Sequence, residues 1–408
     1  MAAPNPQPSL ATNKLFEPLT IANGKITLAH RVILAPLTRN RGSPLKPSST
    51  ASDPNRTWLP TDLMAEYYAQ RASRGGLLIT EGVPPSLEGN AMPGVPGLFL
   101  EEQKPGWAKI ASAIHDKGGV AYMQLWHSGR ANLPHMTGTP ILSASATPWD
   151  DPEECFMFPP PHTSKPLRYA DHPPKEMSVD DIKRTIADYV RTAKWAIECG
   201  FDGVEVHGGN GYLIEQFLAS NVNKRTDDYG GSPKKRCTFA LELMDELSKA
   251  IGEENLAIRL TPFGLFNQIR SEQRLETWGE LCRKLKENHP RLSYVSFVEP
   301  RYEQIFSASE KQRFLDSWDL STVDLSSFRA IFGDTPFFSA GGFDDKNSAQ
   351  AMDSGVYDGL VYGRWFISNP DLPRRLKEGL ALNPYDRSRF YGPFEEPEVG
   401  YTDYPAWE

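Results

Sequence analysis

A short polar stretch near the middle of the chain carries the residues best suited to chemistry. It follows a β-branched segment at 203–206, contains His207, Asn210 and Tyr212, and leads into a helical pattern that begins at Leu213. The glycines between these residues let the backbone turn and present the side chains together. His207 and Asn210 can both donate hydrogen bonds to one oxygen, and the Tyr212 phenol can supply a proton beside them. A single histidine after a strand is more often an ordinary loop residue, so the rest of the chain must decide between these interpretations.

Other polar residues also stand where apolar segments end. Pro36 and Thr38 close the first such segment, Gln124 lies near the end of another, and Arg259 lies in a third. Amide, hydroxyl and guanidinium donors without a carboxylate pair or a metal-ligand cluster suit a neutral polar cofactor better than hydrolysis. Arg259 has two open interpretations. It is either a salt-bridged rim residue, the usual role of an arginine, or a group that stabilises negative charge on a reduced aromatic cofactor.

Two glycine-containing segment ends near the C-terminus indicate a phosphate site. Gly341 and Gly342 follow one apolar segment, and Gly363 and Arg364 follow the next. Glycine lets backbone amides approach a phosphate closely, and the planar guanidinium of Arg364 matches a dianion. The same glycines fit ordinary turns equally well when each is taken alone.

Eight apolar segments that alternate with helical patterns must position these residues. The predicted strands cover 31–38, 77–80, 120–125, 203–206, 256–260, 294–297, 336–340 and 359–362, and the predicted helices cover 62–74, 105–117, 178–199, 232–251, 277–288, 344–354 and 372–379. This alternation predicts an α/β fold, a single (β/α)8 TIM barrel whose strand ends share one face. An Asn-Gly pair at 23–24 predicts an N-terminal β-hairpin, and the Pro-rich stretch 126–176 predicts a long excursion after strand three. No G-x-G-x-x-G sequence supports a Rossmann domain.

Composition narrows the class of protein further. A formal net charge of −8 and the lack of a dense Lys/Arg block argue against a nucleic-acid partner. The four cysteines are widely spaced, which predicts reduced thiols and no metal site. No apolar run reaches membrane-spanning length, so we expect a cytoplasmic protein without a membrane partner, either monomeric or homodimeric. The domain organisation predicted is a flexible tail at 1–13, the barrel at 14–391 and a C-terminal tail at 392–408.

Five short motifs occur in order along the chain, and their combination is far more specific than any one of them. They lie at 35–39, 124–126, 207–212, 223–232 and 362–372. Together they resemble the Old Yellow Enzyme family of flavin-dependent ene-reductases, over residues 14–391. The resemblance implies a barrel that holds non-covalent FMN across its carboxyl-end mouth and takes a hydride from NADPH or NADH.

The resemblance also implies roles for single residues. Thr38, beside Pro36, is expected near the flavin carbonyl, and Gln124 and Arg259 at the pyrimidine end. The residues implied to hold the phosphate are Gly341, Gly342, Gly363 and Arg364. The catalytic set is His207 and Asn210, which bind the activating oxygen of the substrate, and Tyr212, which donates the proton. The implied walls of the substrate pocket are Trp126, Phe266, Phe390 and Tyr391.

The implied reaction agrees with the chemistry of the residues themselves. Hydride addition to the β-carbon of an enone or enal places charge on the carbonyl oxygen, which His207 and Asn210 can stabilise, and Tyr212 can protonate the α-carbon. Two alternatives remain open: a redox-neutral isomerase or desaturating flavoenzyme, and a non-catalytic binding barrel. The loops at 84–97 and 132–175, the second with 156–158 as possible pocket walls, leave the natural substrate open.

Overall fold

Eight parallel strands close into a barrel. The computed structural model describes residues 9–299, 324–392 and 394–408. In barrel order the strands are β10 (Gly203–Gly208), β11 (Leu256–Leu260), β12 (Tyr294–Val298), β13 (Phe337–Ala340), β14 (Gly359–Tyr362), β3 (Val32–Leu34), β6 (Leu77–Val83) and β7 (Val120–Leu125). Every neighbouring pair is parallel, which confirms the predicted (β/α)8 fold.

The barrel interior is apolar at one end and polar at the other. Alternate residues of each strand face inward. Tyr122, Tyr294 and Phe338 belong to the buried apolar cluster inside the barrel, with ring centroids 5.4 Å and 4.7 Å apart along the row. One step further toward the carboxyl ends, the same alternation places Gln124 on β7 and Glu205 on β10, which are paired in register. The polar layer therefore forms the floor beneath the strand ends.

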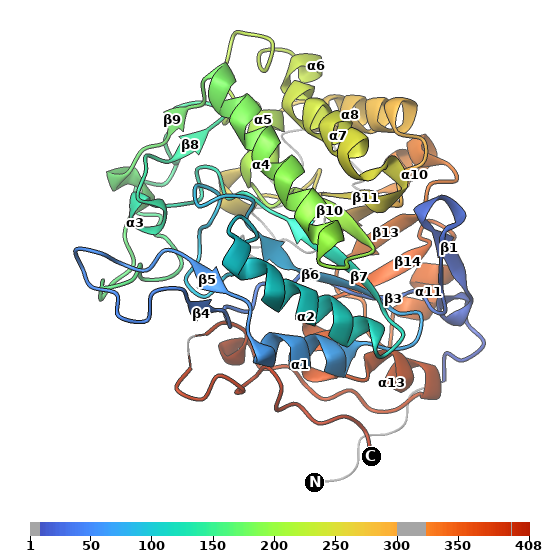
Figure 1. Ribbon diagram of the computed structural model, residues 1–408. Coiled ribbons are helices and arrows are strands. Elements are labelled where there is room, and N and C mark those ends of the chain that lie inside the picture. Colours follow the sequence, from blue (N-terminus) through green and yellow to red (C-terminus); the bar gives the residue numbers. More distant parts are fainter. Residues whose placement is uncertain (1–8, 300–323, 393) are drawn as a thin grey trace.

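Helices surround this barrel on the outside (Figure 1). Those that follow the strands in sequence are α2 (Lys104–His115), α4 (Val179–Glu198), α5 (Leu213–Leu218), α6 (Pro233–Arg236), α7 (Thr238–Ile251), α8 (Arg274–Asn288), α10 (Ser326–Phe332), α11 (Ser348–Asp353), α12 (Arg364–Ser368) and α13 (Leu372–Glu378), while α1 (Asp62–Arg71) lies between β3 and β6. The helix predicted at 232–251 is two helices, α6 and α7, because the helix is interrupted at Cys237. No helix within the described residues is long and apolar enough to cross a membrane.

Short elements cover both ends of the barrel. The predicted hairpin is present as β1 (Leu19–Ile21) and β2 (Ile26–Leu28), with positive φ at Asn23 and Gly24, and it packs on the apolar end of the barrel. The excursion carries α3 (Pro134–Thr137), β8 (Leu142–Ser143) and β9 (Lys175–Glu176), and β4 (Ser43–Pro44) pairs with β5 (Trp58–Leu59). The 3-10 helices are η1 (Lys14–Phe16), η2 (Ala22–Gly24), η3 (Glu101–Gln103), η4 (Tyr169–Asp171), η5 (Glu253–Asn255), η6 (Phe266–Gln268) and η8 (Arg387–Arg389).

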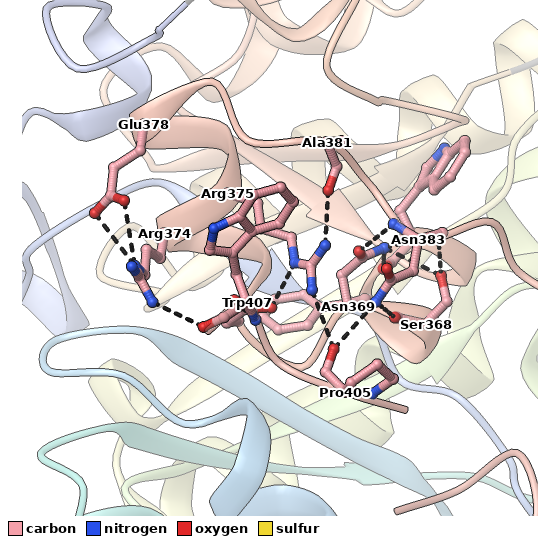
Figure 2. Close-up of polar contacts among 12 residues, drawn as sticks. Ser368, Asn369, Arg374, Arg375, Glu378, Ala381, Asn383, Pro405 and Trp407 are labelled. Carbon is pink, nitrogen blue, oxygen red and sulfur yellow. Dashed lines mark hydrogen bonds and ion pairs between the residues drawn. The ribbon is translucent and has the colours of Figure 1, made fainter. Parts of the chain in front are cut away.

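Both chain ends that the structure describes are packed on the barrel. Of the predicted flexible tail, residues 1–8 lie outside the described residues, but Leu10 is buried and its amide donates to Leu376 O. At the other end, α13 holds the last residues of the chain: Arg375 donates to Pro405 O at 3.0 Å and Arg374 to Trp407 O at 3.0 Å (Figure 2). The last residues of the chain are therefore held against α13.

Candidate active site

A cavity of about 1020 Å³ lies at the carboxyl ends of the strands. It brings together most of the residues that the sequence singled out: Pro36, Thr38, Gln124, Trp126, His207, Asn210, Tyr212, Phe266, Arg364, Phe390 and Tyr391. Four others are not in its lining. Arg259 is buried and pairs in register with His207 across β10 and β11, while Gly341, Gly342 and Gly363 stand at the ends of β13 and β14. Arg259 is thus a buried residue of the floor, whereas one interpretation expected a salt-bridged residue of the rim.

The turn after β10 is held by the neighbouring loop. Asn210 adopts a left-handed backbone with φ 54°, an uncommon conformation for a residue other than glycine. Its amide donates to Thr261 Oγ1 at 2.8 Å, and its carbonyl accepts from Asn267 Nδ2 at 2.9 Å. Both partners follow β11. The close packing of two strand ends therefore fixes the turn that presents the three polar side chains.

The rings of the turn form a compact group. Tyr212 lies edge-on to Trp126, with centroids 5.0 Å apart at 80°, and its centroid is 5.6 Å from that of His207. The side chain of Asn267, which donates to the Asn210 carbonyl, also favours the ionised phenol of Tyr212, but less than burial opposes it. The phenol ring is therefore held by aromatic packing.

Burial sets the protonation of this group. Burial, with a smaller contribution from the positive charge of Arg259, lowers the pKa of His207 to about 3, so the imidazole is neutral at ordinary pH. Burial raises the pKa of the Tyr212 phenol, which therefore keeps its proton. The His207 side chain is only 6% exposed, and its Nδ1 has no hydrogen-bond partner in the part of the chain that the structure describes.

The floor of the cavity contains a charged residue that sequence analysis did not single out. Glu205 is 0% exposed and accepts a hydrogen bond from Gln124 Nε2 at 2.7 Å. Burial raises the pKa of Glu205 and lowers that of Arg259, and each charge opposes the shift of the other. The signal was present, since Glu205 interrupts an apolar strand two residues before His207 and so shares its inward face.

The predicted phosphate residues come from adjacent strands. A Cβ added to Gly341 would stand 2.4 Å from Glu299 Cβ, so this position requires glycine, and Gly342 has φ 78°. Gly363 is the N-cap residue of α12, which begins at Arg364. Arg364 donates to the Tyr385 hydroxyl at 3.1 Å and its guanidinium lies 5.1 Å from the centre of that ring. This arrangement orients the arginine at one end of the cavity.

The outer walls come from the excursion and from the C-terminal region. Met157 lines the cavity, whereas Phe156 is buried against Tyr169 and Phe158 packs on Tyr391, so only one of the three possible wall residues contributes. The remaining lining that sequence analysis missed includes Met92, Asp150, Asp151, Glu154, Cys155, Tyr169, Asn267 and Gln268. These positions are in loops or in the short 3-10 helices η4 and η6, which give no periodic signal, and their places depend on tertiary packing.

Comparison with known proteins agrees with this geometry. The model of the NADH:flavin oxidoreductase / NADH oxidase family matches residues 14–383. The chain belongs to this family. Its relatives include the flavin oxidoreductase hxnT of Emericella nidulans, 44% identical over 96% of this chain and 97% of that protein. The 12-oxophytodienoate reductase 1 of Oryza sativa subsp. japonica is 38% identical over 94% of this chain and 91% of that protein.

Solved structures show the same fold. An Old Yellow Enzyme homologue from Zymomonas mobilis aligns with a TM-score of 0.80 at 31% identity and covers 96% of this chain and 99% of its own. Morphinone reductase in complex with tetrahydroNAD aligns with a TM-score of 0.80 at 34% identity, over 97% of this chain and 98% of its own. The predicted membership of the Old Yellow Enzyme family is confirmed. The protein is an FMN-dependent oxidoreductase of this family, whose description is NADH:flavin oxidoreductase / NADH oxidase.

The residues present fit FMN. Arg259 Nη1 is buried and has no hydrogen-bond partner among the described residues, and a flavin carbonyl would satisfy such a donor. Gln124 lines the cavity with its amide held by Glu205. At the other end, glycine backbone and the Arg364 guanidinium suit a phosphate dianion. Donors for both ends of the cofactor are thus in place.

Proposed function

We propose that the protein is an ene-reductase that acts on α,β-unsaturated aldehydes and ketones, with the hydride delivered to the β-carbon. One observation carries the proposal: a single turn places a neutral imidazole, an amide and a protonated phenol at one cavity, His207, Asn210 and Tyr212. The names of two relatives, 12-oxophytodienoate reductase and morphinone reductase, describe reductases and support the direction of the reaction.

The cofactor supplies the hydride chemistry when it is bound, since a flavin accepts a hydride from a nicotinamide and passes it to the substrate. On this proposal the flavin ring is held by Thr38, Gln124 and Arg259 beside Pro36. The phosphate is held by Gly341, Gly342, Gly363 and Arg364.

His207 and Asn210 orient and activate the substrate. A neutral imidazole donates through one nitrogen and the asparagine amide donates through its NH₂ group, so both can bind one carbonyl oxygen. Charge develops on that oxygen when the β-carbon receives a hydride, and donors held in place by the fold stabilise it without reorganisation. The two residues thus act where the charge appears.

Tyr212 completes the reaction by protonating the α-carbon. Its raised pKa keeps the proton in place until a carbanion-like centre forms beside it. Trp126 and His207 pack on its ring. Trp126, Phe266, Phe390 and Tyr391 supply apolar walls for the rest of the substrate.

A product analysis tests the proposed reaction and separates it from the alternatives. Purified holoenzyme is given 2-cyclohexenone and NADPH or NADH, with and without the nicotinamide, in deuterated water. We expect cyclohexanone with one solvent deuteron at the α-carbon, and no product without the nicotinamide. An isomer of 2-cyclohexenone formed without a hydride donor would instead indicate a redox-neutral isomerase, and phenol formed from it would indicate a desaturating flavoenzyme. No conversion of any enone in a panel would refute the proposal. The monomeric or homodimeric state and the cytoplasmic location stay predictions.

A further inference from the structure

A fully buried carboxylate lies in the cavity floor beside the residues assigned to the flavin. Glu205 faces the barrel interior on β10, in register with Gln124 on β7. Its Oε1 accepts the hydrogen bond from Gln124 Nε2, while its Oε2 has no partner in the part of the chain that the structure describes. A buried carboxylate is costly unless nearby groups compensate for its lost hydration, so its presence here calls for a physical reason.

The compensating charge belongs to Arg259. The positive charge of Arg259 favours the ionised form of Glu205, and the carboxylate in turn favours the charged guanidinium. The two groups do not bond directly, because Glu205 Oε2 and Arg259 Nη1 both lack a hydrogen-bond partner among the described residues. Arg259 can therefore donate to a ligand while the negative charge of Glu205 partly offsets its positive charge.

Glu205 also determines how Gln124 presents its amide. In the ionised form, which the positive charge of Arg259 favours against the effect of burial, the carboxylate only accepts hydrogen bonds, so the NH₂ group of Gln124 turns toward it. The amide oxygen is then the atom left for a ligand in the cavity, and Gln124 offers an acceptor where Arg259 offers a donor. The edge of a flavin pyrimidine ring presents both an N–H donor and a carbonyl acceptor. Binding both requires one acceptor and one donor on the protein, which are the groups that Gln124 and Arg259 offer.

We infer that Glu205 is a positioning residue, the buried counter-charge that fixes the amide of Gln124 and offsets Arg259, and thereby lowers the reduction potential of bound FMN. Reduction adds negative charge to the flavin, which an uncompensated Arg259 would stabilise more strongly than the Glu205–Arg259 pair does. The inference rests on FMN as the cofactor and does not require that enones be the substrates.

The test is the two-electron reduction potential of holoenzyme carrying Glu205→Gln, measured against a reference dye under anaerobic conditions. Glutamine keeps the size of the side chain and removes the charge. We expect the ratio of reduced to oxidised flavin at a fixed dye potential to rise at least tenfold, a shift of about 30 mV for a two-electron couple. We also expect weaker FMN retention, followed by the fluorescence of released flavin, because glutamine no longer fixes the orientation of Gln124.

Two further variants keep the test decisive. Glu253→Gln removes a buried carboxylate in η5, at the opposite end of β11, and should leave the potential unchanged. If Glu205→Gln does not hold FMN, Glu205→Met removes the same charge with an apolar side chain and should raise the potential in the same direction. A potential that is unchanged or lower in an FMN-loaded Glu205 variant would overturn the inference. A holoenzyme that reduces no enone yet shows the shift would refute only the proposed function.

Discussion

Replacing Tyr212 by phenylalanine isolates the proposed proton transfer from binding. The change removes one oxygen and keeps the ring that packs on Trp126 and His207, 5.0 Å and 5.6 Å away between centroids. The ring contacts that hold the side chain are kept, so the fold should be unaffected. Flavin reduction by NADPH should therefore keep its wild-type rate, and phenolic ligands should bind almost as tightly as before.

The step that should change is reoxidation of the flavin by an enone. A positioned general acid contributes about 10²–10⁴ in rate, which corresponds to roughly 3–5 kcal/mol of barrier. Exposed residues such as Asp151 and Glu154 line the cavity, so its outer part is open to solvent and water can deliver the proton more slowly. We therefore expect a loss near the lower end, about 10²–10³.

Anaerobic stopped-flow measurements of both half-reactions, in the wild type and in Tyr212→Phe, test this prediction. Tyr169→Phe is a matched control, because Tyr169 also lines the cavity but lies stacked on Trp149, 4.1 Å between centroids. Its two half-reactions should stay near wild type. A Tyr212→Phe enzyme that cyclohexenone reoxidises at the wild-type rate would show that water or another group delivers the proton, and Tyr212 would then be only a wall of the pocket.

Four further outcomes follow from the same geometry. Arg364→Ala should weaken FMN binding through loss of a phosphate contact. An unchanged affinity for FMN in equilibrium dialysis would show that Arg364 does not bind the phosphate. Thr38→Ala should change the rate of flavin reduction relative to reoxidation, and stopped-flow traces in which neither changes would contradict its place near the flavin. His207→Ala should slow hydride transfer to enones by about 10²–10³ and weaken phenol binding, with absorbance titration as the check. Burial lowers the pKa of His30 to about 4 and those of His127 and His207 to about 3, so only the unfolded chain takes up these protons as the pH falls below about 6.5. The Tm should therefore fall between pH 6.5 and pH 4, and a flat profile would contradict the burial of neutral histidines.

The barrel itself was predictable from the sequence, because local signals and tertiary structure agree there. The runs at 120–125, 256–260 and 359–362 became strands with the predicted bounds, since each is apolar and is stopped by a turn. The helix predicted from 178 also begins there, and its N-cap residue Ser178 accepts a hydrogen bond from Asp181 N at 3.1 Å. Periodicity and capping are properties of neighbouring residues and need no knowledge of the fold.

The site was predictable only in part, because several of its contacts join residues that are distant in the chain. Asn267 donates to the Asn210 carbonyl from η6, in which it has φ 53°. A left-handed asparagine between two apolar segments gives no periodic signal. Glu205 was overlooked for a different reason. A single acidic residue does not change the prediction of a strand for an apolar segment, so its own role attracts no attention. The roles assigned to the site residues remain proposals for mutagenesis.

The most direct measurement is the anaerobic visible spectrum of the holoenzyme through one turnover. We expect one FMN per chain, bleaching of its absorbance by one equivalent of NADPH or NADH, and full return of the absorbance when 2-cyclohexenone is added, with an equal amount of cyclohexanone formed. Reduced flavin that persists in the presence of enones and is reoxidised only when air is admitted would contradict the account.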